Sequence, residues 1–292
     1  MNLRKILSLM LALVAVMSLT LTASAFDTAK EIAVVSREEG SGTRSAFIEL
    51  TGVMTKVDGV EMDNTYAEAD FVSGTSLVMT TVESNEYAIG YASLSSVLQN
   101  DAVVAVPVNG VTPSAESILD GTYPIARPFN IVTKGELTDE LARDFMAFVL
   151  SVQGQEIVAE DGLVPVSTEE TQEYKPQNLK GTLVVGGSTS VAPVIELLKE
   201  AYEELNPDVE VDVQSTGSSA GVTGALDGTY ALGMASRDLK DSELEAGALP
   251  VVIGVDGIAL IKNPANPIAD LSLEQVRAIF TGEIRTWSEL GE

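Results

Sequence analysis

The sequence predicts an α/β fold, because short apolar strand patterns alternate with helical patterns along most of the chain. The clearest indication is a junction that occurs three times: an apolar strand runs into a helix through a turn rich in Gly, Ser and Thr, at residues 36–44, 186–190 and 215–221. One such turn is also typical of an ordinary helix cap, but three are not. Parallel strands bring such junctions to one sheet edge, where backbone N–H groups and helix dipoles favour an anion.

The first 25 residues predict a secretory signal peptide. Arg4 and Lys5 precede an apolar run over 6–21, and Ala23-Ser24-Ala25 has the small-residue pattern of a cleavage site. That run is short for a membrane anchor, and no later stretch is long and apolar enough to span a bilayer. The chain has no Cys, so we expect no disulfide and no lipid-modified thiol. These features predict a secreted or extracytoplasmic protein that is not lipid-anchored.

Composition excludes several function classes. A formal charge of −26 makes nucleic acid and anionic membrane surfaces poor partners. The absence of His removes Ser-His triads and His-ligated metals, so we expect no metal and no cofactor. A Ser nucleophile with a Lys base remains conceivable, but neither a convincing Ser-x-x-Lys motif nor a Gly-x-x-x-x-Gly-Lys-Ser/Thr loop is present. The sequence therefore predicts no catalytic residues and a protein that is not an enzyme.

In the first half of the chain, a strand over 32–35 leads into a helix that starts at Ser45. Residues 57–69 are polar and charged, which predicts a surface loop. The next patterns predict a helix, two strands and a helical turn, at 75–84, 87–94, 102–108 and 114–120. Two prolines within 123–132 disfavour a central hydrogen-bonded strand there and favour an extended crossing segment.

In the second half, 138–160 has apolar residues on one helical face, with Gly154 as a point of kinking or breaking. Residues 167–180 have no periodicity and few apolar side chains, which predicts a linker. The apolar run 251–261 predicts a long strand interrupted at Asp256-Gly257. The remaining patterns predict strands at 182–185, 209–213 and 232–238, a helix from about 191, and a last helix that Ser272 caps and that runs to Phe280.

Several of these segments resemble the phosphate-binding proteins that serve bacterial phosphate ABC transporters. The resemblance rests on Gly-Gly-Ser-Thr-Ser-Val-Ala-Pro (186–193), Gly-Ser-Ser-Ala-Gly (217–221), Gly-Met-Ala-Ser-Arg (233–237), Phe-Thr-Gly-Glu-Ile-Arg-Thr-Trp (280–287) and Arg-Glu-Glu-Gly-Ser-Gly-Thr-Arg (37–44). It implies the two-lobed fold of type II periplasmic binding proteins, in which two crossing strands join two α/β lobes around a ligand cleft. It further implies a monomer that captures inorganic phosphate and delivers it to the permease subunits of an ABC transporter.

The order of the motifs differs from the family's usual order. In the family, the motif at 186–193 lies near the mature N-terminus, and the motif at 280–287 directly precedes the one at 37–44. The chain therefore resembles a circular permutant whose older termini are joined through 167–180. With crossing segments expected at 125–131 and 256–262, we expect one split lobe, 26–126 plus 262–292, and one continuous lobe, 127–261.

The resemblance also implies which residues bind phosphate. Donors are expected from both lobes, so that the ligand favours their closure. Those matched to the family's motifs are Arg37, Ser41, Gly42 and Thr43 from the split lobe, and Thr189, Ser190 and Ser218 from the continuous lobe.

The chain departs from the family's best-known pattern at Arg237. In that pattern the matching residue is an Asp, which accepts the proton of HPO₄²⁻ and thereby rejects sulfate, an ion without such a proton. Here Arg237 adds donors, unless it forms a salt bridge with Asp238 or Asp241. A replacement acceptor is expected from Asp256, Asp238, Glu38 or Glu39. We favour Asp256, which interrupts an apolar strand, although a strand-end turn explains it equally well.

The sequence is also compatible with two further functions. Without a settled carboxylate acceptor, the ligand could be another tetrahedral oxyanion, namely sulfate, molybdate or a phosphonate. Alternatively, the chain is a sensor or scaffold that kept the fold and lost the ligand.

Overall fold

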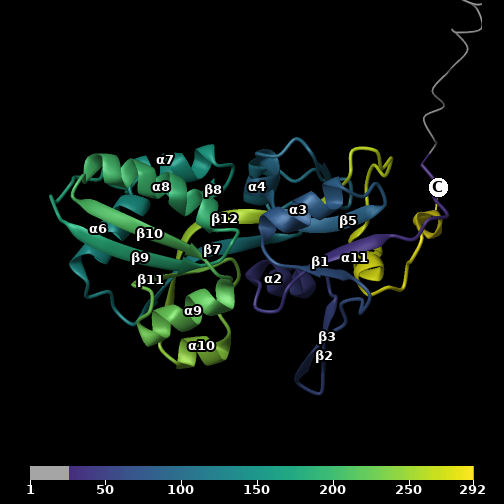
Figure 1. Ribbon diagram of the computed structural model, residues 1–292, viewed down its shortest axis with the longest axis horizontal. Helices are drawn as coiled ribbons and strands as arrows, with labels where there is room; N and C mark the ends of the chain where they lie inside the picture. Colours follow the sequence, from purple (N-terminus) through teal and green to yellow (C-terminus); the bar gives the residue numbers. More distant parts are fainter. Residues whose placement is uncertain (1–25, 292) are drawn as a thin grey trace, which may run out of the picture.

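The computed structural model describes residues 26–291, so the predicted signal peptide lies outside the described residues (Figure 1). In the first part of the chain the strands are β1 (Ala33–Arg37), β2 (Met54–Val57), β3 (Val60–Asp63), β4 (Asp70–Val72), β5 (Ala88–Ser93), β6 (Val104–Val106) and β7 (Ala126–Lys134). The helices of this part are α2 (Gly42–Leu50), α3 (Thr75–Glu83), α4 (Leu94–Leu98) and α5 (Ala115–Leu119).

The second part of the chain continues the alternation of strands and helices. Its strands are β8 (Val164–Pro165), β9 (Gly181–Gly187), β10 (Val209–Ser215), β11 (Leu232–Ala235) and β12 (Ala248–Lys262). Its helices are α6 (Glu140–Val149), α7 (Val152–Glu160), α8 (Ala192–Leu205), α9 (Ser218–Asp227), α10 (Asp241–Glu245), α11 (Leu273–Phe280) and the 3₁₀ helix η1 (Trp287–Leu290).

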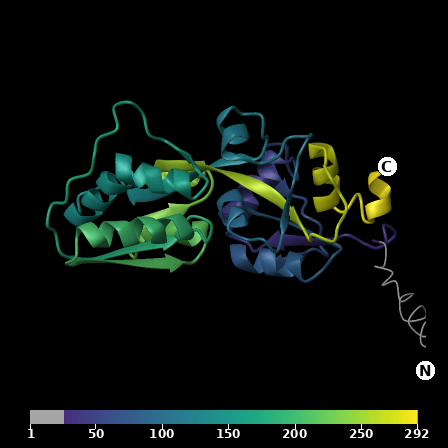
Figure 2. The same ribbon diagram turned by 90° about the horizontal axis from the view of Figure 1, so that it is seen from above.

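Two α/β lobes lie side by side and share two long antiparallel strands, β7 and β12 (Figures 1 and 2). The main sheet has the order β10-β9-β11-β7-β12-β5-β1-β4, with β6 and β8 also paired to β12. Its two ends are parallel, because β9 pairs in parallel with β10 and β11, and β1 with β4 and β5. The predicted α/β fold with two crossing strands is confirmed.

The two largest buried apolar clusters follow the two lobes. One contains Val35, Phe47 and Phe280, and the other contains Phe145, Ile195 and Tyr202. The predicted division placed all of 127–261 in one lobe, but the apolar side chains of 258–261 pack in the first cluster, with Val35. The crossing from one core to the other along β12 therefore falls between 253 and 258.

The prediction that prolines keep 123–132 out of the central sheet is wrong, because β7 lies between β11 and β12. The sheet tolerates Pro128 for a local reason. β7 pairs with β11 only over Asn130–Val132. At Pro128 the sheet therefore loses no hydrogen bond to a β11 carbonyl, although proline has no N–H group. β12 is also continuous through Asp256 and Gly257, where an interruption was predicted.

Two other local predictions need correction. Residues 57–69, predicted as a loop, contain most of an exposed hairpin of β2 and β3, which projects from the split lobe in Figure 1. The helix predicted over 138–160 is broken at Leu150 and Ser151 rather than at Gly154. Ser151 starts α7 by accepting a hydrogen bond from the Gly154 N–H at 3.2 Å.

The segment 167–180 has no helix or strand, as a linker would, yet it is anchored to the continuous lobe. Tyr174 is 8% exposed and packs in that lobe's core. Its hydroxyl donates to the Asp144 carboxylate at 2.6 Å, and its backbone N–H donates to Gln153. This connection therefore has a fixed path across the lobe.

The two ends of the described chain meet in the split lobe. The Ile32 N–H donates to the Arg285 carbonyl at 2.7 Å, and the Ser288 N–H donates to the Thr28 carbonyl at 2.7 Å. The Phe26 and Trp287 rings pack edge to face, 5.9 Å apart. Within residues 26–291, no helix combines the length and the apolar character needed to cross a membrane.

Candidate functional site

Three predicted Gly-rich junctions meet where the lobes touch. The Thr43 and Ser190 hydroxyls are 2.9 Å apart across the lobe boundary, and both residues are buried. An Arg37 Nη2 donates to the Thr189 hydroxyl at 3.0 Å, also between lobes. The backbone N–H of Ser219 donates to the Gly40 carbonyl at 3.1 Å. The N-terminal ends of α2, α8 and α9 therefore converge on one place, as anion sites at helix N-termini require.

Arg37 is the cationic group of this place and is only 1% exposed. Its Nε and Nη2 both donate to the Glu38 carboxylate at 2.8 Å, in a bidentate pair. Burial by itself raises the pKa of Glu38, but the hydrogen bonds and charge of Arg37 outweigh this effect and hold that pKa below its usual range. Glu38 thus fixes the guanidinium, whereas the sequence alone favours a solvated loop residue at this position over an acceptor.

Ser41 and Gly42 form the start of α2. The Ser41 hydroxyl accepts from the Arg44 N–H at 3.3 Å and caps the helix. Gly42 permits a close approach between the lobes. A Cβ at this position would lie 2.8 Å from both the Ser218 Cβ and the Ser236 Oγ, and closer still to the Ser218 Oγ. Only glycine fits this contact between α2 and α9.

A second set of hydroxyls lies beneath this contact in the continuous lobe. The Ser188 hydroxyl donates to the Ser236 Oγ at 2.9 Å, and the Ser236 N–H donates to the Ser218 Oγ at 3.1 Å. All three serines are buried, with Ser218 fully inaccessible. They hold the starts of α8 and α9 at a fixed separation.

The Arg237 guanidinium makes no hydrogen bond to the other predicted site residues. Its Nη1 and Nη2 donate to the two Glu243 carboxylate oxygens at 2.8 Å, and Nη1 also donates to the Asp238 carbonyl at 2.9 Å. Burial raises the pKa of Glu243, but Arg237 outweighs this effect and leaves that pKa lowered. The alternative of a salt bridge is therefore what the structure has, with Glu243 as the partner.

Asp256 is also paired, in this case with Arg127 at the crossing of β12 and β7. The Arg127 Nη2 and Nε donate to one Asp256 oxygen at 2.9 and 3.2 Å, and both side chains are buried. Burial raises the pKa of Asp256 against the opposing charge of Arg127. The Arg127 Nη1 donates to the Ser236 carbonyl at 3.0 Å, so Asp256 reaches the site only through Arg127.

Thr75 is the residue that sequence reasoning missed. Its hydroxyl lies 3.2 Å from the Thr189 hydroxyl, 3.1 Å from the Ser190 hydroxyl and 3.4 Å from the Arg37 Nη1. The signal was present, because Ser73-Gly74-Thr75-Ser76 follows β4 and opens α3. It is a fourth junction of the same kind, so four helix N-termini converge here.

The described part of the chain holds no group of three or more Asp, Glu, His or Cys side chains arranged to bind a metal ion. The convergent groups at the lobe boundary are instead hydroxyls, backbone N–H groups and one guanidinium. These are donors suited to an anion with several oxygens.

Comparison with known proteins assigns this chain and its fold to a family. The family model described as "PBP superfamily domain" matches residues 17–153 and 171–292. "Phosphate-binding protein PstS 2" of Streptococcus agalactiae is 43% identical over 262 residues, which cover 89% of this chain and 88% of that protein. "Phosphate-binding protein PstS" of Pseudomonas aeruginosa is 34% identical over 132 residues, which cover 40% of this chain and 41% of that protein.

A solved structure gives the same result. The phosphate-binding protein of a phosphate ABC transporter from Streptococcus pneumoniae is 41% identical to this chain, with a TM-score of 0.71. The match covers 89% of this chain and all of that one. This chain thus shares its two-lobed fold with a solved phosphate-binding protein. The chain belongs to the PBP superfamily and, within it, to the family of PstS phosphate-binding proteins.

Proposed function

We propose that this chain is an extracytoplasmic binding protein that captures inorganic phosphate between its lobes and delivers it to the permease subunits of an ABC transporter. The observation that carries the proposal is the convergence of four helix N-termini and the buried Arg37 at the lobe boundary. A phosphate ion has four oxygens and needs several donors from different directions. The proposal includes no catalytic step, since the relatives are binding proteins.

The proposed donors come from both lobes. The split lobe contributes Arg37, Ser41, Gly42, Thr43 and Thr75. The continuous lobe contributes Thr189, Ser190 and Ser218. The cross-lobe hydrogen bonds of 2.9–3.2 Å mark points where one anion would be within reach of both sets. When the lobes are closed, the anion accepts hydrogen bonds from both sets of donors; when they are open, it accepts them from one set only. The additional hydrogen bonds stabilise the closed arrangement of the lobes.

Arg237 and Asp256 have a different proposed role. The Arg237 guanidinium is paired with Glu243 and the Asp256 carboxylate with Arg127, and neither is hydrogen-bonded to a donor named above. We therefore propose that they position the loops around the site rather than bind phosphate. Glu38 is a carboxylate bonded directly to one of the proposed donors, Arg37. We propose Glu38 as the acceptor of the phosphate proton, which sulfate does not have.

The order of the segments supports the proposal of a circular permutation. The chain aligns with the streptococcal protein over almost its full length, but with the Pseudomonas protein over about two fifths. A difference in segment order produces such a partial match, since one alignment cannot join segments placed in opposite order. A hydrogen bond between Ile32 and Arg285 joins the two separate pieces of the chain that make up the proposed split lobe.

The proposal also covers location and assembly. We propose that residues 1–25 direct export, that the exported protein has no lipid anchor, and that it is a monomer whose partner is the transporter. The absence of Cys from the sequence supports the lack of a thioether-linked lipid.

Calorimetric titration of the protein with phosphate and then with sulfate, at pH 6 and pH 8, tests the function. We expect one phosphate site per chain and no heat from sulfate. Tight binding of sulfate would show that phosphate is not the specific ligand and would favour a binding protein for another oxyanion. A folded protein that gives no heat with either anion would favour a sensor or scaffold.

A further inference from the structure

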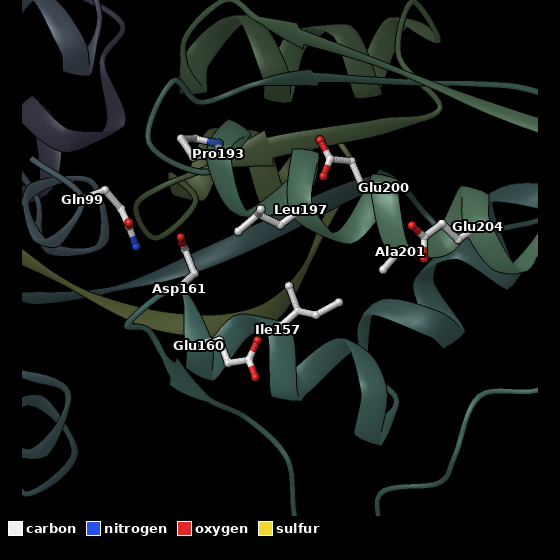
Figure 3. A pocket seen from close by; sticks show the side chains of 9 residues that line it. All are labelled: Gln99, Ile157, Glu160, Asp161, Pro193, Leu197, Glu200, Ala201 and Glu204. Carbon is white, nitrogen blue, oxygen red and sulfur yellow. The ribbon is translucent and has the colours of Figure 1, made fainter.

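A groove lies between α7 and α8, on a part of the molecule that the proposed phosphate site does not use (Figure 3). Its volume is about 610 Å³, within the range of small-molecule sites. Gln99, which follows α4, closes one end of the groove from the other lobe. The lining residues are Gln99, Ile157, Glu160, Asp161, Pro193, Leu197, Glu200, Ala201 and Glu204.

The lining has an apolar floor and acidic edges. Ile157, Leu197 and Ala201 provide the apolar surface, while Glu160, Asp161, Glu200 and Glu204 provide four carboxylates. None of the lining residues is basic. The nearby Lys199 pairs with Glu196 at 3.7 Å and does not line the groove. A ligand that lies here would meet methylene contacts below and negative charge on both sides.

Asp161 is the residue that distinguishes this groove from an ordinary acidic surface. It is 5% exposed, and its Oδ2 is buried without any hydrogen-bond partner. Figure 3 shows its carboxylate pointing into the space between Gln99 and Leu197. Burial raises the pKa of Asp161 to about 6 and outweighs the hydrogen bond from Ser95 to this carboxylate, which lowers it, so the unpartnered Oδ2 is costly. A cationic donor in the groove would remove that cost.

The geometry excludes a single metal ion as the occupant. Within the described chain, no group of three or more carboxylates converges closely enough to hold a metal. The acids are spread along the groove instead, with Glu200 and Glu204 on successive turns of α8. From Pro193 to Glu204 this helix contributes a wall about 16 Å long, at about 1.5 Å per residue. An extended ligand with separated charges matches this spacing.

We propose that the groove binds a linear polyammonium cation, that is, a free polyamine. Its methylene segments would lie on Ile157, Leu197 and Ala201. One ammonium group would donate to the Asp161 Oδ2, and another would lie between the Glu200 and Glu204 carboxylates. This site is separate from the proposed phosphate site, and the proposal does not depend on phosphate binding.

Isothermal titration with spermidine tests the site. We expect one molecule bound per chain with a submillimolar Kd. Asp161→Asn should weaken binding at least tenfold, because it removes the buried charge and keeps the shape of the side chain. The matched control is Glu61→Gln, which removes one exposed charge from the β2–β3 hairpin and should change the Kd by less than twofold. Equal losses in the two variants would indicate general charge attraction and overturn the proposal.

A second variant avoids any effect on folding. Glu200 and Glu204 are exposed, so Glu200→Gln with Glu204→Gln should leave the melting temperature unchanged and weaken spermidine binding at least fivefold. Butylamine, which has one ammonium group, should bind at least tenfold more weakly than spermidine, and 1 mM Mg²⁺ should not displace spermidine. Absence of spermidine binding to the wild type, equal affinity for butylamine, or displacement by Mg²⁺ would overturn the proposal.

Discussion

Replacing Gly42 by Ala tests whether phosphate is bound by lobes that close as they do in this structure. The added Cβ would lie 2.8 Å from the Ser218 Cβ and the Ser236 Oγ, whereas carbon atoms in contact are about 3.5–4.0 Å apart. Both neighbours belong to the opposite lobe, so the clash arises only on closure. Relieving it requires the lobes to separate by about 1 Å.

That separation has a calculable effect on binding. The cross-lobe distances Thr43–Ser190 and Arg37–Thr189 are 2.9 and 3.0 Å, and an additional 1 Å or so takes such pairs beyond hydrogen-bonding range. If an anion loses two charge-assisted hydrogen bonds from one lobe, at about 1.5–3 kcal/mol each, the affinity falls by about 3 kcal/mol or more. We therefore expect a rise in the phosphate Kd of about 150-fold.

Calorimetric titration with phosphate measures this effect, and thermal melting without phosphate provides the folding control. The melting temperature should change little, because Ala is at least as favourable as Gly within α2. Ser45→Ala, one turn further along α2, is the matched control and should bind phosphate within twofold of the wild type. A Gly42→Ala protein with wild-type affinity would refute the closure argument.

Three other predictions concern single side chains. Arg37→Ala should weaken phosphate binding by about 2 kcal/mol or more in calorimetry, because it removes a buried cationic donor and leaves Glu38 unpaired. Thr75→Val, which keeps the shape and removes only the hydroxyl, should weaken binding by about 1 kcal/mol, and unchanged affinity would remove Thr75 from the site. Because burial raises the pKa of Asp161 to about 6, the folded state holds this proton more tightly than the unfolded state. Stability should therefore fall as the pH rises from about 4 to 6, and denaturant titrations of Asp161→Asn should show a flatter pH dependence and higher stability at pH 7.5.

The sequence was most informative where the site depends on local backbone geometry. A strand that ends in Gly, Ser and Thr before a helix places N–H groups and hydroxyls in the same way wherever it occurs. Together with the family's motifs, this regularity assigned Thr43, Ser190 and Ser218 to the site. It would also have predicted Thr75, because Ser73-Gly74-Thr75-Ser76 has the same form.

The sequence was least informative about which charges pair. Arg127 and Asp256 are 129 positions apart and meet only because β7 and β12 cross in one register. The partner of Arg237 is Glu243 rather than the nearer Asp238 or Asp241, because α10 turns the Glu243 carboxylate back towards the guanidinium. Such pairs are decided by tertiary structure, so a motif match for Arg237 and a place in an apolar strand for Asp256 assigned to the ligand two groups that are in ion pairs with Glu243 and Arg127.

The same pairs connect the crossing strands β7 and β12 to the site. Arg127 holds Asp256 on the neighbouring crossing strand and donates to the Ser236 carbonyl, while the Ser236 N–H donates to Ser218 at the start of α9. A chain of buried hydrogen bonds thus runs from the crossing strands to the helix end that meets Gly42. Breaking a buried ion pair leaves an uncompensated charge, which is strongly destabilising. The crossing strands are therefore held in one geometry, and this geometry sets where Ser218 stands when the lobes close.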